Sequence, residues 1–202
     1  MDFLFVFLGT LIILSLFNVG ECFYKKAGLN HFVFASYLAF TLGLLFVPNL
    51  NVGNFSFSFA GFFLPLAISV KFLTEIKSIK QIGVYLISVL ISATGYMIYA
   101  LLAPETFQVV QPYIFAGIGL AILCFLCLKN ARLVYSSIFF GLSLGEIIFY
   151  QTKFSGSEQI VPIGEPKVIT TLILGFIVGL FMEGVRYAYI KRKETRLAKQ
   201  KN

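Results

Sequence analysis

The chain alternates between long apolar runs and short polar breaks. Runs of about 17 to 25 apolar residues are long enough to cross a bilayer as helices. Seven runs qualify: Phe3–Val19, His31–Val47, Phe57–Leu73, Ile82–Ala103, Pro112–Leu128, Arg132–Tyr150 and Val168–Ile190. The breaks carry turn-forming residues such as Pro48-Asn49, Pro104-Glu105 and Lys129-Asn130, and none could hold a soluble domain. The pattern therefore predicts an all-α integral membrane bundle of seven transmembrane helices.

Composition supports lipid as the solvent for much of the surface. Of the 202 residues, 58% are hydrophobic and 12% are charged, and the mean hydropathy is +0.89. A soluble domain carries about 25% charged residues, so this chain has more apolar surface than one core could enclose. We expect it to lie in a membrane, specifically the cytoplasmic membrane of a bacterium or archaeon.

The positions of the cations predict the direction of insertion. With seven spans and an outside N-terminus, fourteen of the 16 Lys and Arg residues fall on the cytoplasmic side, as the positive-inside rule requires. They are Lys25, Lys26, Lys71, Lys77, Lys80, Lys129, Arg132, Arg186, Lys191, Arg192, Lys193, Arg196, Lys199 and Lys201. Residues 1–190 are thus predicted to form the transmembrane domain and residues 191–202 a basic cytoplasmic tail. Because the cations follow topology instead of forming an aromatic-interleaved patch, we expect no nucleic-acid partner.

Small residues four apart indicate where helices approach closely. Membrane helices gain no hydrophobic drive from association in lipid, so their interfaces favour glycine and other small residues. Gly141 and Gly145 have this spacing in the sixth run, and Gly175 and Gly179 in the seventh. Packing within one chain is the first interpretation, and a homo-oligomer is the alternative.

One acidic residue lies within an apolar run. Glu146 stands in the sixth run, about one turn from its outer end. Ionisable groups at membrane depth are costly, so Glu146 is a candidate for binding a cation, relaying a proton or capping a polar pocket. The alternative is a side chain that reaches interfacial water. Ser92 and Tyr96 belong to a polar stripe in the fourth run that could line a path with Glu146, although such serines often bond to their own helix.

The remaining polar residues indicate structure more than chemistry. Glu183 and Arg186 are three apart on one helix, so they share a face and are predicted to form an ion pair. Cys124 and Cys127 form a lone CxxC without a second ligand pair, so no metal or other cofactor is predicted. The chain has one aspartate and one histidine, which disfavours aspartyl and zinc proteolysis. We therefore expect a protein that is not an enzyme and has no catalytic residue.

From Phe57 onward the segment order resembles an uncharacterised family of polytopic membrane proteins, domain of unknown function sixteen-fourteen. The resemblance rests on the glycine-then-proline run Phe59-Ala60-Gly61-Phe62-Phe63-Leu64-Pro65-Leu66 and on Gly145-Glu146, a small residue followed by an acid. It covers about two-thirds of the chain, which lacks that family's paired glycines and its later glycine-rich acidic motif. The resemblance implies a multi-spanning membrane fold and brings no activity with it.

Two functions from different classes are compatible with this inventory. The first is a non-enzymatic scaffold, assembly or regulatory component of a membrane complex, whose basic tail contacts anionic lipid or a membrane-protein partner. The second is a component of a small-solute or ion transporter or channel with Glu146 in its polar path. The surroundings of Glu146 distinguish them, because a transport role requires polar neighbours and room for water.

Overall fold

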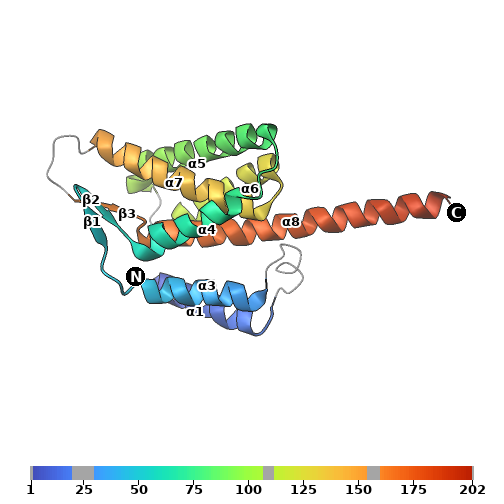
Figure 1. Cartoon of the computed structure of the whole chain (residues 1–202), viewed down its shortest axis with the longest axis horizontal. Coiled ribbons are helices and arrows are strands. Elements are labelled where there is room, and N and C mark those ends of the chain that lie inside the picture. The colour runs from blue at the N-terminus through green and yellow to red at the C-terminus, as the bar shows by residue number, and fades with distance from the viewer. Residues whose placement is uncertain (1, 20–29, 107–111, 154–159, 202) are drawn as a thin grey trace.

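The computed structural model describes residues 2–19, 30–106, 112–153 and 160–201. Consecutive helices run antiparallel to one another through these segments (Figure 1). Each predicted run contains a helix, which confirms the helical, bundle-like fold; Lys25 and Lys26 lie outside the described residues. The helices are α1 (Asp2–Leu16), α3 (His31–Leu44), α4 (Leu64–Leu73), α5 (Ile79–Thr106), α6 (Pro112–Leu128), α7 (Ala131–Lys153) and α8 (Pro166–Lys201).

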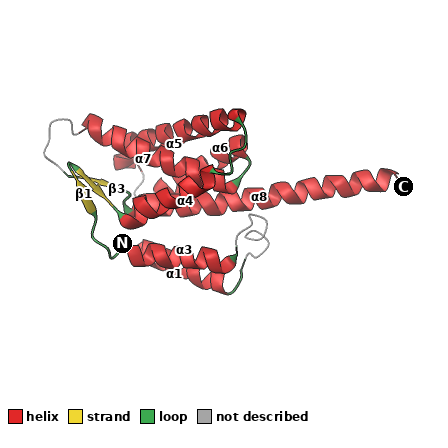
Figure 2. Ribbon diagram, in the orientation of Figure 1, coloured by secondary structure: helices red, strands yellow, loops and turns green. Residues whose placement is uncertain are grey.

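A small sheet at one end of the bundle was not predicted (Figure 2). Strands β1 (Leu50–Val52) and β2 (Phe55–Phe57) form an antiparallel hairpin, and β3 (Val161–Ile163) pairs with β2 in parallel. Gly53 takes the first position of the two-residue hairpin loop with φ 58°, where a side chain would be strained. The sheet joins the α3–α4 connection to the α7–α8 connection, which are distant in sequence.

The third predicted run begins with an irregular turn. Residues Phe59–Phe63 form the π-helical turn η1, and α4 follows with Pro65 in its first turn. Proline has no N–H to donate to the carbonyl of Gly61, four residues earlier, and its ring crowds that carbonyl, which disfavours regular α-helical hydrogen bonding in this turn. The helix therefore changes from π-helical to α-helical type just before the proline.

Two helices extend beyond the predicted ends of their runs. Helix α5 continues through Pro104 to Thr106, so the break expected at Pro104-Glu105 is wrong. Helix α8 continues from Pro166 through the charged segment to Lys201 and projects far beyond the bundle (Figure 1). Lys, Arg and Glu are good helix formers, and the change from apolar to charged residues near Ile190 therefore leaves the helix unbroken. It crosses the predicted boundary between residues 190 and 191 without interruption.

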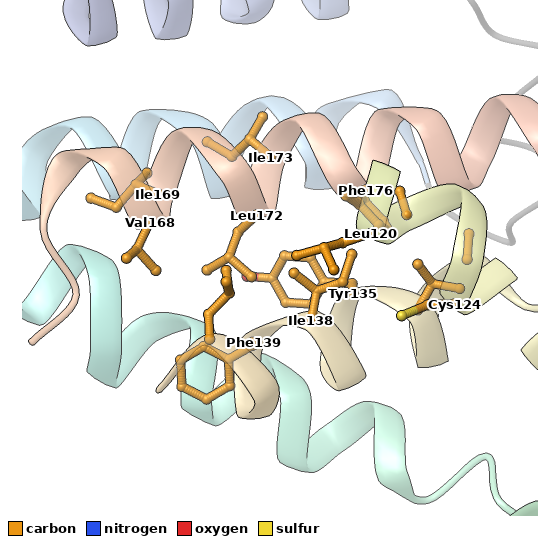
Figure 3. Close-up of a cluster of buried hydrophobic side chains, with 14 of the residues drawn as sticks. Leu120, Cys124, Tyr135, Ile138, Phe139, Val168, Ile169, Leu172, Ile173 and Phe176 are labelled. Carbon is orange, nitrogen blue, oxygen red and sulfur yellow. The ribbon is translucent and has the colours of Figure 1, made fainter. Parts of the chain in front are cut away.

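The core lies where α6, α7 and α8 meet (Figure 3). Tyr135 and Phe139 of α7 are its largest fully buried side chains. Helix α3 joins this core through the Phe34 ring, 5.9 Å from that of Phe176, and through a 2.8 Å hydrogen bond between the hydroxyls of Tyr37 and Tyr135. Long-range polar and aromatic contacts thus hold the N-terminal helix pair against the rest of the bundle.

Helix length and surface character differ along the chain. Within the described residues, three segments are both long and apolar enough to cross a membrane: Ile79–Leu101, Ala131–Thr152 and Pro166–Thr195. Four further apolar helices are shorter: Leu4–Leu16, His31–Leu44, Phe59–Leu73 and Ala116–Leu128. Large apolar side chains such as Leu101 and Val6 are more than two-thirds exposed on these helices, which would be unfavourable in water.

Candidate functional site

Glu146 is fully buried near the sheet end of α7. Its Oε2 accepts a 3.0 Å hydrogen bond from the backbone N–H of Gly164, in the turn between β3 and α8. Its Oε1 has no hydrogen-bond partner within the described part of the chain. The structure therefore does not place this carboxyl at interfacial water, and half of its hydrogen-bonding capacity is unused.

Close packing of α5 against α7 places Ser92 and Tyr96 against two glycines of α7. A Cβ added at Gly141 would lie 2.2 Å from the Cβ of Ser92, and one at Gly145 would lie 3.0 Å from the Tyr96 ring. Both glycines therefore mark an intramolecular contact that no larger residue would permit without a shift. Gly145 in particular allows Tyr96 to lie beside the residue that precedes Glu146.

A second pair of glycines brings the chain around to Glu146. Gly164 has φ 77°, and its backbone lies against that of Gly61 in η1. A Cβ on Gly61 would be only 1.9 Å from the carbonyl oxygen of Gly164. The backbone N–H of Ser58 also donates to the carbonyl of Ile163 at 3.0 Å. We call the arrangement of Gly61, Gly164 and Glu146 the glycine clasp.

A small cavity near the clasp has both polar and apolar walls. Its volume is about 10 Å³, and its walls include Tyr96, Tyr99, Lys167 and Thr171. That is near the lower limit for one water molecule. Lys167 forms a 2.5 Å ion pair with Glu165, and these two are the charged groups close enough to influence Glu146. Sequence reasoning missed both, although Gly164-Glu165-Pro166 is a turn signal that could have drawn attention to them.

Ser92 belongs to a different environment from Glu146. Its hydroxyl donates to the carbonyl of Ser88 at 3.0 Å and lies 3.3 Å from the Cys124 sulfur of α6. It is fully buried one helical turn from Tyr96. The structure thus brings Tyr96 and Glu146 together, whereas Ser92 is satisfied by its own helix and by α6.

The predicted ion pair between Glu183 and Arg186 is not formed among the described residues. Glu183 instead accepts a 3.1 Å hydrogen bond from the backbone N–H of Ala131, and Arg186 donates to the carbonyl of Lys129 at 2.9 Å. The N–H of Ala131 lies at the start of α7 and the carbonyl of Lys129 at the end of α6. Backbone groups at helix ends have no partner within their own helix, so these two side chains supply the missing hydrogen bonds. The two residues therefore hold α8 to the α6–α7 turn.

The other predicted packing glycines lie along α8. A Cβ at Gly175 would lie 2.9 Å from Ile138 of α7, and one at Gly179 would make ordinary contact with Ala131 at 3.5 Å. A Cβ at Gly117 of α6 would lie 3.0 Å from the carbonyl oxygen of Thr171 in α8. Within the described residues, no group of three or more His, Cys, Asp or Glu side chains could hold a metal ion.

A bundle of apolar helices with lipophilic exposed faces and a buried carboxyl defines an integral membrane protein. The family model of YphA-like integral membrane proteins matches residues 3–202. The chain belongs to this family. The match supports the membrane fold implied by the earlier resemblance but not the particular family named there. No curated protein matches the chain, and no solved structure matches it.

Proposed function

We propose that the chain crosses the membrane seven times, with its N-terminus outside and its C-terminus in the cytoplasm. Three long and four shorter apolar helices supply the seven candidates. The shorter helices reach at most about 26 Å, so the bilayer would thin locally to match them. The α4–α5 and α6–α7 connections lie at the end of the bundle from which α8 projects, and the sheet lies with the N-terminus at the other end (Figure 1). Of the fourteen cations, those in the described residues belong to α4, to α8 and to the residues at or near these two connections.

Labelling of introduced cysteines tests this topology. Asn51→Cys and Glu194→Cys are made in a chain whose three native cysteines are replaced by serine, since both positions are exposed. A membrane-impermeant thiol reagent should reach Asn51→Cys from outside and Glu194→Cys only after the membrane is opened. Labelling of both from the same side would contradict the odd number of crossings proposed between these two positions.

Within that topology, we propose a non-enzymatic role as a scaffold, assembly or regulatory component of a membrane complex. The projection of α8 carries this proposal. The helix has 36 residues, and about 20 suffice to cross the hydrocarbon core, so about 24 Å of helix remain. The remaining segment carries six cations from Lys191 onward. It therefore presents a preformed cationic helix to a membrane-protein partner or to anionic headgroups.

Charge reversal on the projecting helix tests this role. Lys191, Arg192 and Lys193 are changed together to Glu, and the size of the complex in gently solubilised host membranes is measured by native electrophoresis. We expect the wild-type chain in an assembly larger than its 22.6 kDa and the variant in a smaller one. Lys77→Glu with Lys80→Glu, away from α8, is the control. Equal sizes for all three proteins would refute the proposal.

The second candidate function is proton or cation transport through Glu146, and its buried, unpartnered Oε1 favours it. A proton or cation that reached Oε1 could bind there, because no protein group occupies this oxygen in the described residues. The neighbouring cavity has room for about one water, so a conformational change would have to open the path. Proton and sodium fluxes are compared in liposomes containing wild-type, Glu146→Gln or Glu75→Gln protein. Loss of flux in Glu146→Gln alone would support transport, and absence of wild-type flux would exclude it.

A further inference from the structure

Helices α6 and α8 enclose an apolar groove on the outer surface of the bundle. Its volume is about 550 Å³. Phe125, which is buried, and Met182 form its floor, and the exposed side chains of Leu126, Phe181 and Val185 form its walls. The groove is far larger than the cavity near Glu146 and lies at the C-terminal end of α6, against the middle of α8.

One end of this groove is polar and cationic. Lys129, Arg186 and Tyr189 complete the lining there. Lys129 directly follows the last residue of α6, and Arg186 precedes the charged segment of α8 by about one turn. Both cations thus stand where the apolar stretches end, at the depth of lipid headgroups. Neither Lys129 nor Arg186 forms an ion pair with a carboxylate in the described residues.

The polarity changes in a regular order along α8. Residues three or four apart share a helix face, so Phe181, Val185 and Tyr189 form one stripe that continues to Arg192 and Lys193. The stripe passes from apolar to aromatic to cationic over about 18 Å. A phospholipid changes from apolar acyl chains to an anionic headgroup in the same direction, and tyrosine is favoured at that boundary. An apolar transmembrane helix of a partner protein would fill the groove without needing Lys129 and Arg186 at its end.

We propose that the groove between α6 and α8 is a binding site for one anionic phospholipid. An acyl chain lies between Phe181 and Leu126, and the phosphate is bound by Lys129 and Arg186. Arg186 already donates one guanidinium N–H to the carbonyl of Lys129. That hydrogen bond holds the guanidinium at the mouth of the groove and leaves its other donors for the phosphate. The site is distinct from the proposed protein-partner role and does not depend on it.

The site is tested with the full chain, stripped of lipid in detergent, by native mass spectrometry during titration with dioleoyl phosphatidylglycerol. Dioleoyl phosphatidylcholine, with the same chains and no net charge, is the comparison lipid. We expect one tightly bound phosphatidylglycerol and at least tenfold weaker phosphatidylcholine. Lys129→Asn should weaken phosphatidylglycerol binding about fivefold, as expected for one cation at a lipid surface. Asparagine tolerates the positive φ of 56° found at Lys129.

Three further variants make the outcome decisive. Lys80→Asn removes an equal charge from an exposed position at the start of α5 and should change affinity less than twofold. Val185→Trp fills the groove and should weaken both lipids. Arg186→Gln should weaken phosphatidylglycerol binding at least as much as Lys129→Asn does. Because Arg186 also bonds to the Lys129 carbonyl, its replacement can destabilise the fold. If Arg186→Gln lowers the melting temperature, the result for Lys129→Asn alone decides the test. Equal binding of the two lipids, or equal losses in Lys129→Asn and Lys80→Asn, would overturn the proposal. So would a disulfide-linked dimer of a Val185→Cys variant whose yield on oxidation is not lowered by prior addition of phosphatidylglycerol.

Discussion

The contact between Gly61 and Gly164 makes Gly61→Ala the most informative single substitution for the fold. The added Cβ would lie 1.9 Å from the Gly164 carbonyl oxygen, whereas ordinary contact begins at 3.4 Å. The two backbones must therefore separate by about 1.5 Å. Because both atoms belong to the main chain or are fixed to it, no side-chain rotation can relieve the overlap.

The expected loss follows from what that separation disturbs. Overpacking in a well-packed interior costs about 1–3 kcal/mol. The same movement strains the hydrogen bonds from Ser58 to Ile163 and from Gly164 to Glu146, and the loss of one adds about 1 kcal/mol. We expect Gly61→Ala to lower the free energy of unfolding by about 2–4 kcal/mol. For a chain of this length, that corresponds to a fall of about 6–12 °C in melting temperature.

Thermal unfolding of purified protein in one detergent measures this effect. Gly83→Ala is the matched control, because a Cβ there meets nothing within 4 Å and the residue lies in α5. Replacing a helical glycine at such a position should stabilise by about 0.5–1 kcal/mol. The reasoning fails if Gly61→Ala melts within 1 °C of wild type while Gly83→Ala behaves as expected.

Three other predictions concern contacts between distant elements. Tyr37→Phe and Tyr135→Phe should each destabilise by about 1 kcal/mol, and the double variant by less than their sum, in a double-mutant cycle of melting free energies; strict additivity would mean that the hydroxyls do not interact. Glu75→Gln removes the ion pair with Arg132, which is only about a quarter exposed; we expect a loss of about 1 kcal/mol that shrinks at high salt, and a salt-independent loss would contradict it. Gly141→Leu should separate α5 from α7 and abolish folded expression, as judged by size-exclusion chromatography; a monodisperse wild-type profile would contradict this.

The helices were predictable because each is a local feature of the sequence. Hydropathy located the seven α-helices found in the described residues, and His31, Leu73 and Leu128 are boundaries in both the predicted runs and the structure. The strands were not predictable, since three residues such as Leu50–Val52 are too few to show an alternating pattern. The continuation of α8 could have been predicted, because Lys191–Lys199 contains strong helix formers and no Gly or Pro.

The site was predictable as a list of residues but not as an arrangement. The cost of a buried charge singled out Glu146, and the spacing of Gly141 and Gly145 indicated close packing. The partner of Glu146 is a backbone N–H at Gly164, which has no side-chain signature in the sequence. Glu183 and Arg186 show what residue spacing cannot predict. Their spacing of three correctly places them on one face of α8, but both bond instead to backbone groups of the α6–α7 turn.

Helix α8 begins at the glycine clasp and ends in the cationic segment, without a break in its 36 residues. Its length is about 54 Å. Between these ends it is fixed twice: Leu172, Phe176 and Leu180 are buried in the core, and Glu183 and Arg186 hydrogen-bond to the α6–α7 turn. Because the helix has no break beyond this second attachment, the bundle itself sets the direction in which the cationic segment points. One continuous helix thus connects the turn that donates a hydrogen bond to a buried carboxyl with an exposed cationic surface.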